Sequence, residues 1–131
     1  MKNARKVMLP SVETQTLVFV AGARATGERV VARWLCWGGF RVYLRIWRNY
    51  EAAGAVLGEV LMIANVEVPE RCRGRGWFKA YLELCELLGF DALLIESVVN
   101  KRLRGHLRKR ADFVELDGNH FLRSCKTERL L

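Results

Sequence analysis

The residues best suited to chemistry lie in a short segment near the middle of the chain. Arg71, Arg73 and Arg75 bring positive charge to this segment. Gly74 and Gly76, which alternate with the last two arginines, let the backbone approach a ligand closely. Where such a segment opens a helix, its free N–H groups and the helix dipole attract an anion. The spacing therefore predicts a cradle for a phosphate or pyrophosphate group.

The common phosphate-binding motifs differ from this loop. A P-loop ends in Gly-Lys-Ser/Thr, which is absent here, and the dinucleotide motif needs a third glycine beside Gly74 and Gly76. The same residues would also suit an exposed basic turn whose glycines serve only its geometry. Taken alone, the loop favours neither the ligand-binding interpretation nor the purely structural one.

The loop resembles the signature of the GNAT superfamily of N-acetyltransferases, Arg/Gln-x-x-Gly-x-Gly/Ala between a strand and a helix. Arg71–Gly76 matches this signature literally. A second register, Arg73–Phe78, would place Phe78 at the final small residue. The spacing from Val68-Pro69 slightly favours this second register, so Arg71–Phe78 is the candidate window. The resemblance extends from about Ala55 to Leu122, and the part of the chain before it is short for the family.

The resemblance implies an α/β (α+β) fold of one domain over residues 1–131, with a mixed, mostly antiparallel sheet and helices on both faces. It implies a splayed parallel strand pair, Ala64–Val68 and Leu93–Ser97, with acetyl-CoA in the gap as co-substrate and no metal. An amine acceptor would attack the thioester directly. The residues expected to bind the cofactor are Val66, Val68, Arg71, Arg73, Gly74, Arg75, Gly76, Trp77, Phe78 and Asn100.

The residues that would move protons are less clearly marked. The tyrosine that many family members use as general acid would fall near Leu107 or Arg108, where this chain has none. Glu67 in the splayed strand is the first candidate for the base, and Glu59 is the second. His106, on the helix beside the expected thiol, has a side chain suited to acid–base work. Each of them also has a structural interpretation, as a solvated strand carboxylate, an arginine partner or part of a basic helix face.

The elements that must position these residues are predicted from hydrophobic periodicity and turn residues. Strands are expected at Thr14–Ala21, Phe40–Arg48, Ala55–Val68 (broken near Gly58 or Ala64), Ala92–Val99 and in a hairpin of Val114–Leu116 with His120–Arg123. Helices are expected at Glu28–Trp37, before the stop signal Gly38-Gly39, at Gly76–Leu88, and at Lys101–Arg110, which Asn100 would cap. The strand–loop–helix–strand order around the motif predicts a right-handed crossover between two parallel strands.

The composition of the chain limits the cellular compartment and the kinds of partner that we expect. The four cysteines form no C-x-x-C pair, and no secretory signal is visible, so we expect reduced thiols and a cytoplasmic location. The longest apolar run, Leu17–Ala23, has the length of a strand, so no membrane contact is expected. The formal net charge of +8 suits a polyanion such as coenzyme A.

Two other functions stay open. Lys101–Arg110 is rich in lysine and arginine and could follow a nucleic-acid backbone, although it lacks interleaved aromatic residues for base stacking. The absent helix tyrosine also leaves room for a fold that binds acetyl-CoA without catalysis. The sequence does not identify the amine acceptor or fix the oligomeric state, and a homodimer stays open.

Overall fold

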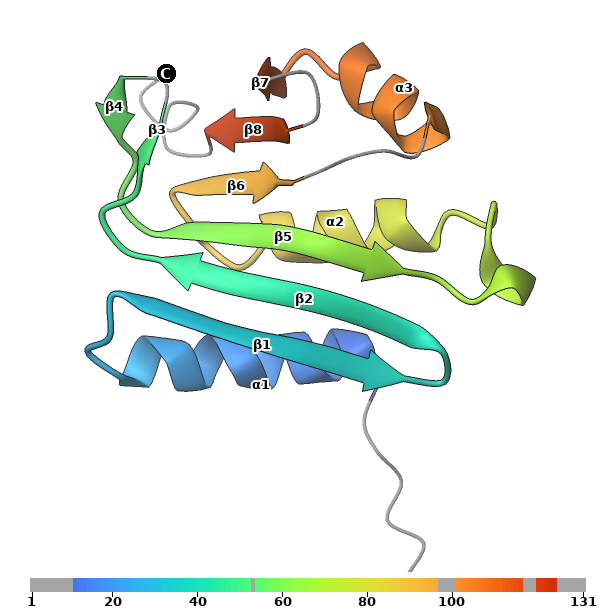
Figure 1. Cartoon of the computed structure of the whole chain (residues 1–131), viewed down its shortest axis with the longest axis horizontal. Helices are drawn as coiled ribbons and strands as arrows, with labels where there is room; N and C mark the ends of the chain where they lie inside the picture. The colour runs from blue at the N-terminus through green and yellow to red at the C-terminus, as the bar shows by residue number, and fades with distance from the viewer. Residues whose placement is uncertain (1–10, 53, 97–100, 117–119, 125–131) are drawn as a thin grey trace, which may run out of the picture.

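The computed structural model describes residues 11–52, 54–96, 101–116 and 120–124. Within them, six strands form one mixed sheet in the order β1-β2-β5-β6-β8-β7, and β3 and β4 form a separate pair (Figure 1). The helices are α1 (Val12–Ala25), α2 (Trp77–Glu86) and α3 (Lys101–Lys109). The strands are β1 (Val30–Trp37), β2 (Phe40–Trp47), β3 (Glu51–Ala52), β4 (Ala55–Val56), β5 (Val60–Glu67), β6 (Ala92–Ile95), β7 (Val114–Leu116) and β8 (His120–Ser124).

The predicted fold class is confirmed, because the sheet is mostly antiparallel and contains one parallel pair, β5 with β6. The predicted strand at 40–48 and the helix at 76–88 are confirmed as β2 and α2. Helix α3 and the β7–β8 hairpin also lie where they were predicted. Asn100, Ser97 and the hairpin turn at 117–118 lie outside the described residues.

The predicted strand Thr14–Ala21 is wrong, because these residues lie inside α1. Ser11 begins the helix by accepting a hydrogen bond from the backbone N–H of Thr14 at 3.2 Å. The buried residues recur with helical spacing, at Val12, Thr16, Phe19, Val20 and Ala23. The β-branched residues that suggested a strand are overridden by the packing of this face, because propensity is a weak preference beside burial.

The predicted helix Glu28–Trp37 is also wrong, since Val30–Trp37 forms β1 and pairs antiparallel with β2. The register runs from Val30 opposite Trp47 to Trp37 opposite Phe40, so the two strands are joined by Gly38 and Gly39 alone. Both glycines have positive φ, +57° and +89°, as the tight turn of a two-residue hairpin requires. The glycine pair that suggested the end of a helix is therefore a hairpin turn.

The predicted strand Ala55–Val68 is interrupted at both suggested places. Gly58, with φ of +79°, separates the short β4 from β5. Further along, Tyr43 lies opposite Asn65 while Leu44 lies opposite Ile63, so Ala64 is an extra residue in β5. Ala64 therefore forms a β-bulge, which locally disrupts the ladder with β2.

The parallel pair joins Val60–Ile63 of β5 to Ala92–Ile95 of β6. The backbone N–H of Glu96 donates one more hydrogen bond to the carbonyl of Ile63, at 3.0 Å. The sequence placed this pair at Ala64–Val68 and Leu93–Ser97, so the observed pairing begins earlier along β5. Within the described chain, β5 beyond Ala64 pairs only with β2.

The main hydrophobic core lies between the helices and one face of the sheet. Buried side chains from all three helices, such as Phe19, Leu82 and Leu107, belong to this single cluster. The hydroxyl groups of Thr16 and Tyr81 lie 2.8 Å apart and join α1 to α2, which Figure 1 shows on the same side of the sheet. No helix in the described part of the chain is both long and apolar enough to cross a membrane.

A smaller hydrophobic cluster lies on the opposite face of the sheet. The sequence predicted helices on both faces, and therefore on this one as well. The cluster is formed by Val60, Met62, Ala92, Leu94 and Leu122. In the described residues, the segment that carries β3 and β4 packs on this cluster through Tyr50 and Leu57. The rest of this face, over β1 and β2, leaves Trp34 with 41% of its surface exposed.

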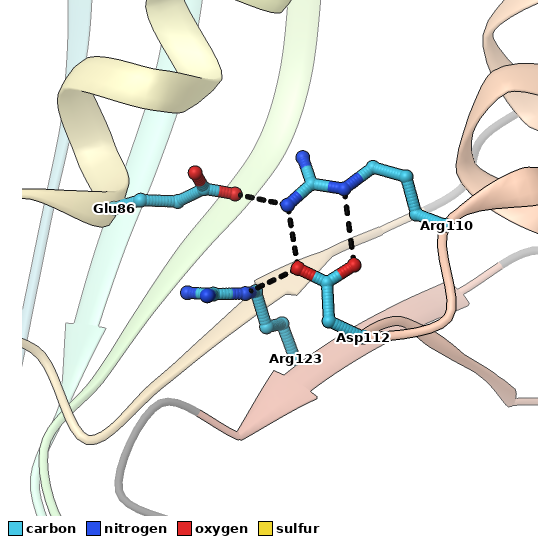
Figure 2. A network of polar contacts seen from close by, with 4 residues as sticks. All are labelled: Glu86, Arg110, Asp112 and Arg123. Atoms are coloured by element: carbon cyan, nitrogen blue, oxygen red, sulfur yellow. Dashed lines mark hydrogen bonds and ion pairs between the residues drawn. The ribbon is translucent and has the colours of Figure 1, made fainter. Parts of the chain in front are cut away.

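A polar network fastens the C-terminal part of the fold to α2 (Figure 2). Arg110 donates to Glu86 at 2.9 Å and to Asp112 at 2.5 Å, and Arg123 donates to the same Asp112 carboxylate at 2.7 Å. Burial by itself raises the pKa of Asp112, but the hydrogen bonds from Arg110 and Arg123 outweigh it and lower that pKa below its ordinary value. The network therefore stabilises the folded state through an ionised carboxylate.

Candidate functional site

The arginine–glycine loop joins the C-terminal end of β5 to the first turn of α2. A single 3-10 turn at Glu70–Cys72 opens it. Gly74 and Gly76 follow with φ of +75° and +81°, in the left-handed region that other residues rarely adopt. Gly76 is the N-cap of α2, and a Cβ on it would meet no atom within 4 Å. The backbone at Gly76 is therefore open on the side where a Cβ would point.

The start of α2 offers a run of free backbone donors. The first hydrogen bond of the helix runs from the N–H of Ala80 to the carbonyl of Gly76, at 3.1 Å. The N–H groups of residues 74 to 79 donate to no other residue in the described part of the chain. Free N–H groups at the positive end of a helix dipole attract anions, so a phosphate cradle stays the prediction for this loop.

The three arginines differ in how they are held. Arg71 donates to the carbonyl of Gly38 at 3.1 Å, which ties the loop to the tip of the β1–β2 hairpin. Arg73 donates from Nε to the carbonyl of Val68 at 2.8 Å. Arg75 is exposed and makes no side-chain hydrogen bond or ion pair with another described residue. Among the described residues, none of the three arginines forms an ion pair with a carboxylate.

Trp77 and Phe78, which the sequence assigned to cofactor binding, are half-buried and pack toward the core. The indole N–H of Trp77 donates to Glu13 of α1 at 2.9 Å, and its ring stacks on Tyr81 with 5.0 Å between centroids. These contacts fix the start of α2 against α1. Because Phe78 faces the core while Gly76 faces open space, the geometry favours the register Arg71–Gly76.

The predicted catalytic residues do not come together. Glu67 lies near the loop, with 49% of its side chain exposed, and pairs with Arg41 at 3.3 Å. Glu59 precedes β5 at the other end of the strand and pairs with Arg24 at 2.9 Å. At about 3.3 Å per residue, the two carboxylates are separated by roughly 25 Å along the strand. His106 is half-buried on α3, and its buried Nε2 has no hydrogen-bond partner among the described residues.

One carboxylate at the end of the parallel strand pair was missed by the sequence reasoning. Glu96 follows β6 directly, and Arg45 of β2 approaches it at 2.8 Å. The side chain of Glu96 is only 17% exposed. The signal in the sequence was the charge itself, since Glu96 interrupts an otherwise apolar run of residues.

Comparison with solved structures finds a similar fold in the following three complexes. A tyrosine-to-phenylalanine mutant of the AtaT toxin, bound to the C-terminus of the antitoxin AtaR, matches with a TM-score of 0.52 and 14% identity over 70% of this chain. The same toxin with acetyl-CoA also bound has a TM-score of 0.51 and 14% identity. A KacTA–DNA complex matches with a TM-score of 0.51 and 14% identity, over 89% of this chain and 84% of that one.

The chain has a GNAT-like fold. No family model matches the sequence, and no curated protein matches it either. At 14% identity the likeness is one of fold. The matched region spans 62% of the length of each of the two AtaT chains.

The GNAT-like fold here lacks a tyrosine on α3 that could act as general acid. Tyr81 is the tyrosine nearest the loop in sequence, but it lies on α2 in the core and bonds to Thr16. Burial raises the pKa of Tyr81 above its ordinary value and raises the pKa of the neighbouring Cys85 to about 12. Both groups therefore stay protonated at neutral pH and serve the core. In the described residues, no group of three or more His, Cys, Asp and Glu side chains is arranged to hold a metal.

Proposed function

We propose that this protein is an N-acetyltransferase that transfers the acetyl group of acetyl-CoA to an amine by direct attack. The observation that carries the proposal is the run of N–H groups at residues 74 to 79, which donate to no other described residue, together with the nearby Arg71, Arg73 and Arg75. Acetyl-CoA presents a pyrophosphate, which matches these donors in charge and in geometry. The GNAT-like fold supports the proposal without identifying the acceptor.

The rest of the cofactor would lie along the free part of β5. Beyond the bulge at Ala64, β5 pairs only with β2 in the described chain, so its other edge offers backbone groups. The pantetheine arm carries amides and can add to such an edge in the manner of an extra strand, beside Val66 and Val68. The side chain of Val66 is half-buried against the main core, which fixes the strand under the arm.

The chemistry would depend first on placing the amine against the thioester, because positioning supplies a large part of many enzymatic accelerations. Backbone N–H groups of β5 near the bulge could polarise the thioester carbonyl, as an oxyanion hole does. A base that removes the amine proton would add a further factor. Glu67 and His106 stay candidates for proton transfer, whereas Glu59 lies at the far end of β5.

A thermal-shift and calorimetry panel tests the proposal. Acetyl-CoA at about 100 times its Kd should add about 2.7 kcal/mol to the free energy of unfolding. Coenzyme A should bind as well, because it carries the same pyrophosphate. An unchanged Tm at saturating acetyl-CoA, with no heat of binding, would contradict cofactor use. Tight binding without acetylation of any amine in a broad panel would instead favour a catalytically silent protein.

The nucleic-acid alternative is weakened by the way α3 is built into the fold. Arg108 forms an ion pair with Glu115 at 2.8 Å, and Arg110 at the end of the helix pairs with Glu86 and Asp112. These charges are therefore partly neutralised, although exposed Lys109 remains available. Short DNA and RNA in the same panel distinguish the two functions, because nucleic-acid binding through phosphates weakens steeply with salt.

A further inference from the structure

The end of the parallel strand pair carries an ion pair that spans three strands. The backbone N–H of Glu96, just after β6, donates a hydrogen bond to the carbonyl of Ile63 in β5 at 3.0 Å. The next residue of β5 is the bulged Ala64. Glu96 therefore lies beside the bulge of β5, next to the part of the strand along which the proposed cofactor arm would run.

The two charged side chains lie on the same face of the sheet. Ala92 and Leu94 of β6 belong to the smaller core cluster, and side chains alternate along a strand, so Glu96 points to the face of that cluster. Arg45 stands between Leu44 and Ile46, both of the main core, and so points to the same face. Because β5 lies between β2 and β6, the Arg45–Glu96 pair crosses β5 beside the bulge.

The pair holds one carboxylate oxygen and leaves the other unbonded. Nη1 of Arg45 lies 2.8 Å from Oε1 of Glu96, while Oε2 has no hydrogen-bond partner among the described residues. Glu96 is 17% exposed, against 49% for Glu67. A carboxylate so far withdrawn from water costs free energy unless it is paired, and Arg45 offsets that cost while keeping Oε2 available.

We propose that Glu96 is the catalytic base of the acetyl transfer and that Arg45 is a positioning residue that holds it. The assignment rests on the proposed function. The amine nitrogen bonds to the acetyl carbon and the carbon–sulfur bond breaks, so the sulfur leaves as a thiolate. The proton lost by the amine passes to Oε2 of Glu96 and then to the thiolate. The products are the N-acetylated amine and coenzyme A, and the carboxylate is restored.

Glu96→Gln tests the assignment, because it removes the proton acceptor and preserves the shape of the side chain. We expect kcat for an amine acceptor, taken from a screen of spermidine, polylysine and amino-acid amides, to fall by about 10²-fold. The Kd of acetyl-CoA should change less than about twofold, since Glu96 does not touch the pyrophosphate site.

Glu115→Gln is the matched control, because it removes a carboxylate from another ion pair. Glu115 pairs with Arg108 at 2.8 Å, is 27% exposed and lies on β7, away from the loop. Its kcat should stay within about twofold of the parent enzyme. A comparable loss of kcat in this control would show that removing any such pair disturbs the protein, and would overturn the assignment.

Arg45→Gln and Glu96→Asp separate a positioning role from a structural one. Arg45→Gln keeps the carboxylate but frees it, so kcat should fall by about tenfold while the KM of the amine and the Kd of acetyl-CoA stay close to the parent values. Glu96→Asp should recover part of the rate lost in Glu96→Gln. These two variants also decide the question if Glu96→Gln fails to fold.

Three outcomes would overturn the assignment. Full transfer by Glu96→Gln would remove Glu96 from the chemistry and leave the proposed function standing. A larger loss of kcat in Glu67→Gln than in Glu96→Gln would return the role of base to Glu67. A parent protein that binds no acetyl-CoA would overturn the proposed function and this assignment together.

Discussion

The two ends of β5 are built in opposite ways. Where the strand begins, the backbone N–H of Glu59 donates to Asp91, and the N–H of Asp91 donates back to the carbonyl of Glu59, both at 2.9 Å. The carboxylate of Glu59 is held by Arg24. Beyond the other end, residues 74 to 79 present N–H groups with no acceptor in the described chain. One strand thus begins at a closed end, where its polar groups are paired within the fold, and leads at its other, open end into a loop whose N–H groups are left for a ligand.

Substitutions in the loop at the open end should leave the protein folded but should remove its binding of acetyl-CoA. Gly74→Val and Gly76→Val should abolish binding of acetyl-CoA, because a side chain there blocks the approach of the pyrophosphate or forces a disfavoured φ. Stability should fall by only about 1–3 kcal/mol, the usual cost of such backbone strain. Calorimetric titration and urea unfolding measure the two effects separately.

Gly54→Val is the matched control for these loop variants. Gly54 has φ of +77°, and a Cβ on it would meet no atom within 4 Å, so its local strain resembles that of Gly76. It lies between β3 and β4, away from the loop. It should lose a similar amount of stability and keep full affinity for acetyl-CoA. Parent-like binding by both loop variants would remove the loop from the site.

At the closed end, where β5 begins, a substitution should lower the stability of the fold rather than the binding of the ligand. A Cβ on Gly58 would clash with Oδ2 of Asp91, the oxygen that accepts the hydrogen bond of the Glu59 N–H, and the φ of Gly58 is +79°. Gly58→Ala should therefore lower the free energy of unfolding by about 2–4 kcal/mol, from backbone strain and a lost hydrogen bond together. Urea unfolding beside Gly54→Ala checks this, since equal losses in the two variants would mean that Asp91 moves away without cost.

Much of the sheet and of the open end could be predicted from the sequence. Alternating apolar residues identified β2, the amphipathic pattern identified α2, and the loop between β5 and α2 was recognised by its arginines and glycines. These signals are local, so a single stretch of sequence contains all the information that they need. The cofactor residues Val66, Val68 and Asn100 stay predictions, and Asn100 lies outside the described residues.

The rest could not be predicted because it depends on partners distant in sequence. The sequence predicts a strand where α1 lies, because the β-branched residues outweigh a helical period that only burial makes evident. Gly38-Gly39 ends a helix or turns a hairpin equally well until β2 is seen to pair with β1. Glu96 becomes a candidate for the catalytic base only in the structure, where Arg45, which is distant in the sequence, lies beside it.

A third region, the polar network around Asp112, should show a smaller effect that depends on pH. Asp112→Asn weakens the hydrogen bonds with Arg110 and Arg123, so we expect a loss of about 1–2 kcal/mol near neutral pH. Because folding lowers the pKa of Asp112, its contribution is present above the unfolded value near 3.9 and is lost as pH falls through the folded value. Urea unfolding of parent and variant at several pH values should show the difference shrinking below about pH 4. A difference that stays constant with pH would assign the effect to packing.

The smallest expected effect is a difference in the contributions of Arg73 and Arg75, in the loop at the open end, to the binding of acetyl-CoA. Arg73 is held in place by the carbonyl of Val68 at 2.8 Å, whereas Arg75 is exposed and has no hydrogen-bonded partner in the described chain. A flexible, solvated charge contributes only about 0.2–1 kcal/mol to an ionic contact, so Arg75→Ala should raise the Kd of acetyl-CoA by about two- to fivefold.

The salt dependence of this loss shows what kind of contact Arg75 makes. A screened, long-range attraction shrinks as salt rises, so parent and Arg75→Ala should converge in Kd at about 1 M salt, where the screening length is near 3 Å. Arg73→Ala should lose more affinity and keep most of its deficit at high salt, because the held guanidinium can contact the phosphate directly. If Arg75→Ala instead lost more than Arg73→Ala at every salt concentration, Arg75 would be the contacting residue, and the backbone bond of Arg73 would serve the loop alone.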